Sequence, residues 1–276
     1  MTVPSSASVN ASALRDWREY RRAGPLWFDA TIGLLVLSAI CLAAAGFDQR
    51  LLNGVSTWAK PFKFSLSLAV YFATLLVFFR FLPVEQRQTK SARFMVRSLV
   101  WVALLEMAYI AIQGGLGEAS HYNLATPFHS AMYSLMGAGA TWLVLGLLWL
   151  GWLITKNHSL GEPMVLAIVV GLGLTCVLGG GFGSYLGGQT GHLVNEATID
   201  AHGIWLFNWS TGGGDLRVAH FFGMHAMQII PLFALVLPAR LSARVACASV
   251  VAFSAAYAGF SAHTFVQAIQ GQPFIG

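Results

Sequence analysis

Charged residues are scarce in this sequence: Asp, Glu, Lys and Arg make up only 10% of its 276 residues, whereas hydrophobic residues make up 56%. So few charges cannot cover the surface of a soluble domain, and a mean hydropathy of +0.65 is typical of membrane proteins. The formal charge of +5 would suggest a nucleic-acid partner for a soluble protein. Here the basic residues lie in short segments between apolar runs, so we expect a lipid bilayer, and no nucleic acid, as the partner.

Cysteine is equally scarce. Cys41, Cys176 and Cys247 are odd in number, lie in apolar segments and lack metal-type spacing, which predicts buried free thiols and excludes a disulfide framework. The polar segment 1–27 contains four arginines and no short apolar core typical of a cleavable signal peptide. We expect it to be a cytoplasmic N-terminal segment that precedes an uncleaved membrane anchor.

Seven apolar runs reach the length of about 20 residues that a helix needs to cross a bilayer. We therefore predict an all-α integral membrane bundle, with one seven-helix domain over residues 28–270, a long outer loop at about 187–216 and an outer tail at 271–276. Prolines near the ends of the runs fit these boundaries. The predicted spans are 28–47, 61–82, 96–114, 126–153, 163–186, 217–238 and 243–269.

Basic residues are distributed unequally between the two ends of these spans. Because cytoplasmic loops carry the excess of Lys and Arg, we expect a cytoplasmic N-terminus, an outer C-terminus and a place in a bacterial inner membrane. The larger set is Arg15, Arg18, Arg21, Arg22, Arg80, Arg87, Lys90, Arg93, Arg97, Lys156, Arg240 and Arg244. The smaller set is Arg50, Lys60, Lys63 and Arg217.

Glycine is concentrated in the fifth span, in the run Gly179-Gly180-Gly181 and at Gly183. Small residues allow membrane helices to approach closely. A nucleotide-binding loop would need Lys followed by Ser or Thr after the glycines, and the sequence has none there. We therefore expect tight helix packing and a helix distortion near 179–183.

Histidine and methionine form a stripe in each of two spans that begin at the outer face. The fourth span has His129, Met132 and Met136, and the sixth has His220, Met224 and Met227. Imidazole and thioether ligands suit copper and also serve as axial ligands of haem iron. The alternative is that Met fills gaps between helices and His bonds to loops. The candidate metal ligands are His121, His129, His192, His220, His225, Met132 and Met224.

His220 and His225 point about 140° apart, because each helical residue adds about 100°. They are therefore not expected to share one metal on one helix face. His225 with Gln228, and His263 with Gln267, form polar stripes deeper in the bilayer. Polar side chains at this depth usually face the bundle interior, so we expect them to line an internal cavity; an interhelical hydrogen bond is the alternative.

Glu106 lies near the middle of the third span, with Tyr109 and Gln113 on the same helix face. A carboxyl group at that depth must be protonated or paired, so it suits a proton relay or a ligand site. A structural hydrogen bond between helices explains the residue equally well.

Lys60 and Lys63 open the second span, and Arg217 lies at the mouth of the sixth, all on the sparsely basic outer side. Three cations there suit an anion such as haem propionate, a lipid phosphate or a carboxylate substrate. The alternative is lysines that extend toward lipid headgroups beside the interfacial Trp58.

Three segments carry a resemblance: W-x-K-P-x-K-F at 58–64, Gly117 to Asn123, and G-G-D-L-R at 213–217 leading to H-F-x-G-x-H-A-x-Q at 220–228. In these segments, and over most of its length, the chain resembles a family of bacterial multi-span inner-membrane proteins to which no activity is assigned. The resemblance implies a multi-span membrane protein and supplies no function.

These patterns favour a membrane oxidoreductase or electron-transfer protein that binds haem b or copper near the outer face. Lys60, Lys63 and Arg217 would then bind the propionates, and a quinol or a periplasmic electron-transfer protein would be the partner. The candidate catalytic residues, which would conduct protons or hold the quinol, are Glu106, Gln113 and Gln228.

Two alternatives remain open. One is a transporter or receptor with an outward-facing polar cavity. The other is a zinc-dependent membrane hydrolase in which outer histidines and Asp200 or Asp215 surround a bound water.

Overall fold

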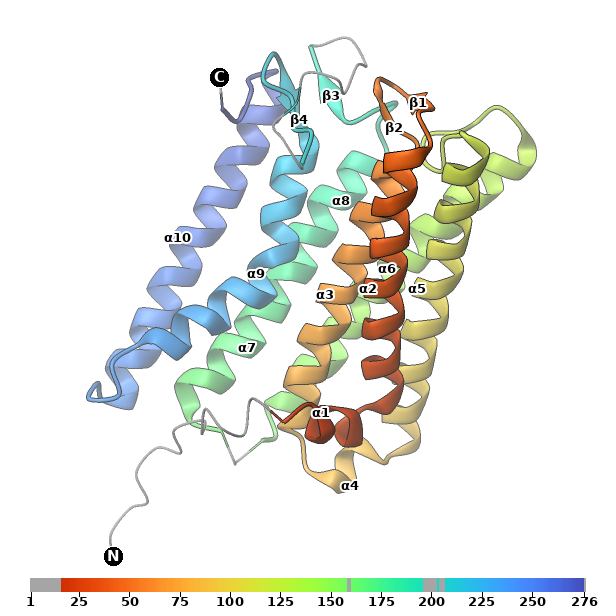
Figure 1. The fold of residues 1–276 in the computed structure, drawn as a ribbon. Coiled ribbons are helices and arrows are strands. Elements are labelled where there is room, and N and C mark those ends of the chain that lie inside the picture. Colours follow the sequence, from red (N-terminus) through yellow and green to blue (C-terminus); the bar gives the residue numbers. More distant parts are fainter. Residues whose placement is uncertain (1–15, 158–159, 196–202, 204–206, 276) are drawn as a thin grey trace, which may run out of the picture.

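Seven helices are long and apolar enough to cross a membrane in the computed structural model, which describes residues 16–157, 160–195, 203 and 207–275 (Figure 1). The predicted all-α, multi-pass architecture is confirmed, and each span ends within several residues of its predicted limits. The seven are α2 (Pro25–Phe47), α3 (Ala59–Arg80), α5 (Lys90–Leu116), α6 (Pro127–Ile154), the run Glu162–Gly187, α9 (Leu216–Val236) and α10 (Ala243–Ile269).

Short elements lie at the two ends of the bundle. At one end are α1 (Trp17–Ala23) and α4 (Val84–Arg87); at the other are β1 (Leu51–Leu52), β2 (Val55–Ser56), β3 (Leu193–Val194), β4 (Gly214–Asp215) and the end of α10 (Figure 1). Both strand pairs are antiparallel, with Leu51 opposite Ser56 and Leu193 opposite Asp215. We call the end that carries the strands the outer end, following the distribution of basic residues.

Helix caps fix the start of the helices that carry the candidate site. Thr126 caps α6 by accepting a hydrogen bond from the His129 backbone N–H at 3.2 Å. Asp215 caps α9 in the same way through the Arg217 N–H at 3.0 Å. Pro231 lies inside α9, where a missing N–H favours a bend.

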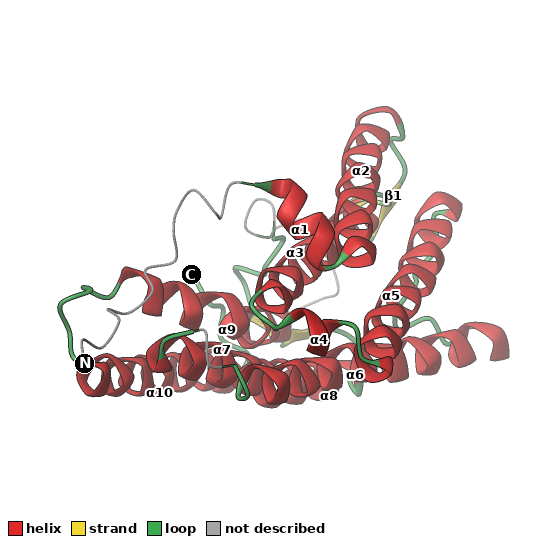
Figure 2. Ribbon diagram, turned by 90° about the horizontal axis from the view of Figure 1, so that it is seen from below, coloured by secondary structure: helices red, strands yellow, loops and turns green. Residues whose placement is uncertain are grey.

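The helices form two groups that meet along α6 and the Glu162–Gly187 run. Helices α2, α3, α5 and α6 share the main hydrophobic core, around Trp27, Phe72, Leu99 and Leu147. Helices α9 and α10 pack against the Glu162–Gly187 run around a smaller core. Viewed from below in Figure 2, α2 and α5 lie on one side of the molecule, and α7, α9 and α10 lie on the other.

The Glu162–Gly187 run is interrupted by a π-helical turn. It consists of α7 (Glu162–Leu174), η2 (Thr175–Gly179) and α8 (Gly180–Gly187). A Cβ atom added to Gly179 would lie 2.7 Å from Met224 Sδ, and one added to Gly223 would lie 2.6 Å from the Gly179 nitrogen. The predicted helix distortion and close packing are therefore present, although the π-helical turn ends where the predicted range begins. Turns of this kind occur often at functional sites.

All three cysteines are free, as predicted. Only Cys41 is fully buried, whereas Cys176 and Cys247 are half-buried. A helix with a lipid-facing side, such as α10, has some of its apolar residues at the surface of the bundle. A hydropathy pattern does not predict which apolar residues these are.

Candidate functional site

The structure separates the candidate histidines into distinct hydrogen-bond networks. His129 of α6 interacts with α5 and the loop that follows it. His121 lies in that loop, against α3 and α6. His220 and His225 lie on different sides of α9, as the helix geometry predicts.

His129, a predicted metal ligand, lies beside Tyr109, which shares a face of α5 with Glu106 and Gln113. Its Nδ1 lies 3.1 Å from the Tyr109 hydroxyl, and its Nε2 lies 3.7 Å from a Glu118 carboxylate oxygen. Gln113 donates a hydrogen bond of 3.3 Å to the same oxygen. Because both ring nitrogens already face a partner, His129 would have to give one up to bind a metal. Glu118 was not identified from the sequence, because it lies beyond the left-handed helix cap at Gly117.

Glu106 lies two helical turns deeper than Gln113 on α5, about 10 Å along the axis. Its Oε1 atom is buried and has no hydrogen-bond partner among the described residues. Gly139 of α6 makes room for this oxygen, because a Cβ atom there would overlap it. Glu106 is therefore separate from the Gln113 and His129 network.

The three predicted cations gather at the outer ends of α3 and α9. Lys63 donates to the Asn208 side-chain oxygen at 2.8 Å and to the Phe207 carbonyl at 3.1 Å. Arg217 donates to the Asn208 carbonyl and to the buried Asp215 carboxylate at 2.7 Å. Lys63 and Arg217 therefore meet at Asn208, in the loop that precedes α9.

His121 connects this cationic cluster to α6. Its ring lies between Phe64 and Tyr133, with centroid distances of 5.2 and 5.9 Å, and its Nδ1 lies 3.1 Å from the Ser120 hydroxyl. Burial, and then the positive charge of Lys60, lower the pKa of His121 to about 3. The imidazole is therefore neutral at physiological pH.

Tyr122 belongs to the same cluster and was not identified from the sequence. Its ring lies 5.5 Å from that of Tyr133, and its hydroxyl donates to the Leu186 carbonyl at 3.2 Å. Burial, followed by the nearby Tyr133, raises the pKa of Tyr122. Its backbone is left-handed, with φ of 57°, a conformation that few non-glycine residues adopt and that a sequence pattern does not report.

On α9, the hydrogen bond of His220 fixes its tautomer. His220 Nδ1 lies 3.0 Å from the carbonyl oxygen of Gly179, at the end of the π-helical turn. A carbonyl can only accept, so Nδ1 carries the proton and Nε2 presents a lone pair. Gly183 of α8 makes room for the ring, because a Cβ atom there would lie 2.8 Å from His220 Cε1.

The tautomer of His225 follows from a chain of hydrogen bonds. Thr74 of α3 donates to the Val70 carbonyl at 2.8 Å, so its oxygen accepts from Gln228 Nε2 at 3.0 Å. The Gln228 carbonyl oxygen then faces His225 Nδ1 at 3.2 Å, which must be the donor. His225 Nε2 is therefore the acceptor, as in His220.

Two of these contacts join facing sides of α3 and α9. At the outer end Lys63 and Arg217 meet at Asn208, and nearer the inner end Gln228 donates a hydrogen bond to Thr74. Between them, Ser67 and Val70 of α3 are exposed, and Phe221 and His225 of α9 are only half-buried. We call these eight residues the α3–α9 groove: Lys63, Ser67, Val70, Thr74, Arg217, Phe221, His225 and Gln228.

Several predicted ligands have a packing role or lie elsewhere. Met132 packs against the main core, and Met224 lies against Gly179. His192 precedes β3, where its carbonyl accepts from the Leu216 N–H at 3.0 Å. His263 was predicted to line a cavity but is exposed on α10, because that face of α10 lies outside the bundle.

No group of three or more His, Cys, Asp or Glu side chains suited to a metal ion occurs within the part of the chain that the structure describes. Asp215 has the capping role that its position favours. Asp200, the other carboxylate considered for a zinc site, lies outside the described residues. The zinc-dependent hydrolase therefore gains no support from the geometry.

Comparison of the chain with protein-family models, with curated proteins and with solved structures finds no match.

Proposed function

We propose that this is a protein of a bacterial inner membrane that binds a lipid-soluble molecule bearing a hydroxyl group, such as a quinol, in the α3–α9 groove. One observation carries the proposal: the hydrogen-bond chain through Thr74 and Gln228 leaves His225 Nε2 as an acceptor. A polar group at this depth in a membrane protein is costly unless it is satisfied, and a ligand O–H would satisfy it.

The walls of the groove suit a molecule with a polar ring and an apolar tail. Phe221 packs beside His225, with ring centroids 4.2 Å apart, and is half-buried, so its exposed part would contact a ligand ring. Val70 is 38% exposed, and Leu66, on the same side of α3, is 36% exposed. These apolar side chains give a tail a path to the surrounding lipid.

In the oxidoreductase reading, His225 would accept a proton from the bound quinol. Oxidation of a quinol to a quinone releases two protons and two electrons, so the reaction also needs an electron acceptor. Haem b or copper is the candidate, and when bound it would supply one-electron chemistry. His220 suits a ligand role, because its Nδ1–H is held by a backbone carbonyl and its Nε2 is unprotonated, a common arrangement in metal-binding histidines.

The other candidate catalytic residues have different expected roles. Gln228 would position His225 through the bond to its Nδ1. Gln113 and Glu106 lie on α5, in surroundings separate from each other and from His225, so proton transfer through them toward the outer end would not start at His225. A periplasmic electron-transfer protein would be the partner at that end.

The test is equilibrium binding of a radiolabelled short-tail ubiquinol to the protein in lipid nanodiscs under anaerobic conditions. We expect saturable binding that falls at least tenfold for His225→Ala. The dimethyl ether of the same quinol, which cannot donate a hydrogen bond, should bind as weakly to the unchanged protein as the quinol binds to the variant.

His263→Ala is the matched control, because His263 is exposed on α10 and away from the groove. It should bind the quinol as the unchanged protein does. Equal binding of the quinol and its dimethyl ether would contradict the proposal. An absorption spectrum with a Soret band, or stoichiometric copper, that is lost in His220→Ala would support the redox role, and absence of both would leave a binding function alone.

A transporter or receptor is the second candidate. It is favoured by the cluster of Lys60, Lys63, Arg217 and the neutral His121 at the outer end, which suits an anionic solute. Uptake of a labelled anion into vesicles, lost in Lys60→Gln and unaffected by a metal chelator, would favour this candidate over the oxidoreductase.

A further inference from the structure

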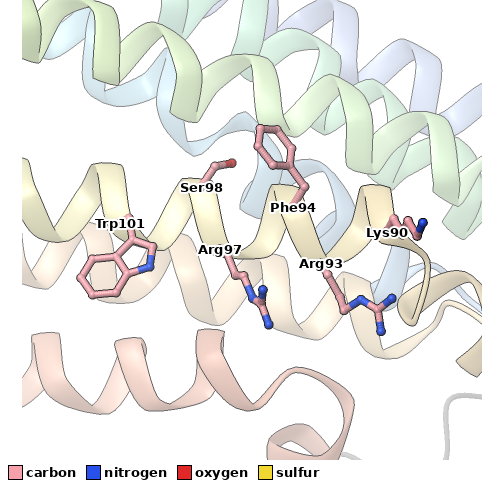
Figure 3. A pocket seen from close by; sticks show the side chains of 6 residues that line it. All are labelled: Lys90, Arg93, Phe94, Arg97, Ser98 and Trp101. Carbon is pink, nitrogen blue, oxygen red and sulfur yellow. The ribbon is translucent and has the colours of Figure 1, made fainter.

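A hollow of about 460 Å³ lies on the surface of α5 at the predicted cytoplasmic end (Figure 3). It lies at the opposite end of the bundle from Lys63 and Arg217, and it is independent of the proposed function. Its lining residues are Lys90, Arg93, Phe94, Arg97, Ser98 and Trp101.

None of the residues that line this hollow is acidic, whereas three of them are positively charged. Lys90, Arg93 and Arg97 follow one another at i, i+3 and i+7 and therefore lie along one face of α5, where like charges repel. The positive end of the helix dipole is at the same place and adds to the repulsion. Among the described residues, none of the three forms an ion pair, whereas Arg80 at the same end pairs with Glu19.

The depth of the hollow matches the boundary between lipid headgroups and acyl chains. Arg97 lies about 10 Å along the helix from Lys90, which leaves roughly the length of a hydrocarbon core between Arg97 and the outer end. Trp101, one turn further into the membrane, is 63% exposed, and Phe94 is 60% exposed. The hollow thus has its cationic side chains, with Phe94 among them, toward the cytoplasm, and Trp101 toward the bilayer centre.

We propose that this hollow binds the headgroup of an anionic phospholipid of the cytoplasmic leaflet. The lipid phosphate lies among Lys90, Arg93 and Arg97, and an acyl chain packs against Trp101. Charge complementarity carries the proposal, since an anion in the hollow offsets a repulsion that no described side chain relieves.

The test uses the full chain reconstituted in an equal mixture of phosphatidylglycerol and phosphatidylcholine, with the lipids retained after detergent extraction measured by native mass spectrometry. The unchanged protein should retain phosphatidylglycerol at least tenfold over phosphatidylcholine. Arg93→Gln with Arg97→Gln should lose most of this preference. Arg240→Gln with Arg244→Gln is the matched control, because it removes two exposed charges from the same end outside the hollow and should keep the preference.

Two further measurements distinguish the outcomes. Trp101→Ala should weaken phosphatidylglycerol retention without changing the binding of inorganic phosphate, which has no acyl chain. In the unchanged protein, raised salt should reduce phosphatidylglycerol retention and leave phosphatidylcholine unaffected. The proposal is overturned if both double variants lose the preference equally, or if salt has no effect on the unchanged protein.

Discussion

Gln228 on α9 donates a hydrogen bond of 3.0 Å to the hydroxyl of Thr74 on α3, across 154 residues of sequence. This bond links the two helix groups of the bundle. It also fixes the orientation of the Gln228 amide, and through it the protonated nitrogen of His225.

Replacement of Thr74 by Val should weaken ubiquinol binding. The substitution removes the only acceptor that orients Gln228 in the described structure, so the amide can turn and His225 loses its fixed tautomer. We expect about a tenfold loss of affinity and about 1 kcal/mol of stability, the typical net value of a hydrogen bond. Nanodisc binding and thermal unfolding in detergent measure the two effects.

Thr141→Val provides the control for that experiment. Thr141 bonds to the carbonyl four residues before it, as Thr74 does, but it is exposed on α6. Its replacement should leave ubiquinol affinity unchanged. A matching loss of affinity in both variants would mean that Thr74 acts only through helix stability.

Gly179→Ala should destabilise the protein by about 1–3 kcal/mol, a typical cost of overpacking. The new methyl group would meet Met224 Sδ at 2.7 Å and the Met224 nitrogen at 3.0 Å, so the contact between η2 and α9 would have to open. Gly181→Ala, whose methyl group would have no neighbour within 4 Å, should be neutral or slightly stabilising. Thermal unfolding of the two variants in one detergent makes the comparison.

The stability of the cluster that His121 forms with Lys60, Phe64 and Tyr133 should depend on pH through His121. The pKa of His121 is about 3 in the folded protein, below its ordinary value of 6.5, so the unfolded chain binds the extra proton more readily. Stability from this residue is therefore complete above pH 6.5 and is lost as the pH falls toward 3. The full loss, reached below pH 3, is about 5 kcal/mol.

His121→Phe should flatten this pH dependence, since it removes the titrating ring and keeps an aromatic group between Phe64 and Tyr133. Lys60 on α3 acts on His121 through its charge, and the Tyr133 ring contacts that of His121. Unfolding midpoints measured between pH 4 and 8 test the prediction. An unchanged slope in the variant would assign the pH dependence to other groups.

Glu106→Gln should leave the unfolding temperature within a few degrees of the original value. The Glu106 carboxyl has an oxygen with no described partner, so the neutral amide loses no bond there. Gly139→Ala should be clearly destabilising, because the new methyl group would overlap that oxygen. If Glu106→Gln instead abolishes folding, the carboxyl has a structural partner that the described residues do not include.

The sequence predicts the helical spans well because hydropathy over about 20 residues is a strong signal. It also places Asp215 at the cap of α9 and the helix distortion close to the glycines that allow it. Helix geometry predicts that His220 and His225 face different directions.

The sequence did not predict which residues from distant parts of the chain contact one another. His129 and His220 have similar stripes, yet one bonds to Tyr109 and the other to the Gly179 carbonyl, because the neighbouring helices differ. The pairing of α3 with α9 depends on which faces meet across the bundle. The helical repeat predicts which residues share a face of one helix, but it does not predict which helix packs against that face.

The most direct test of a ligand bond to His225 is to measure which ring nitrogen carries the proton in His220 and His225. Nitrogen NMR on protein labelled at the imidazole nitrogens makes this measurement. The signals of His220 and His225 can be assigned by their loss in the Ala variants. We expect both rings to be neutral and protonated on Nδ1, and ubiquinol to shift the Nε2 signal of His225. A proton on Nε2 of His225, or no shift with ubiquinol, would contradict the proposed binding of the ligand hydroxyl to His225.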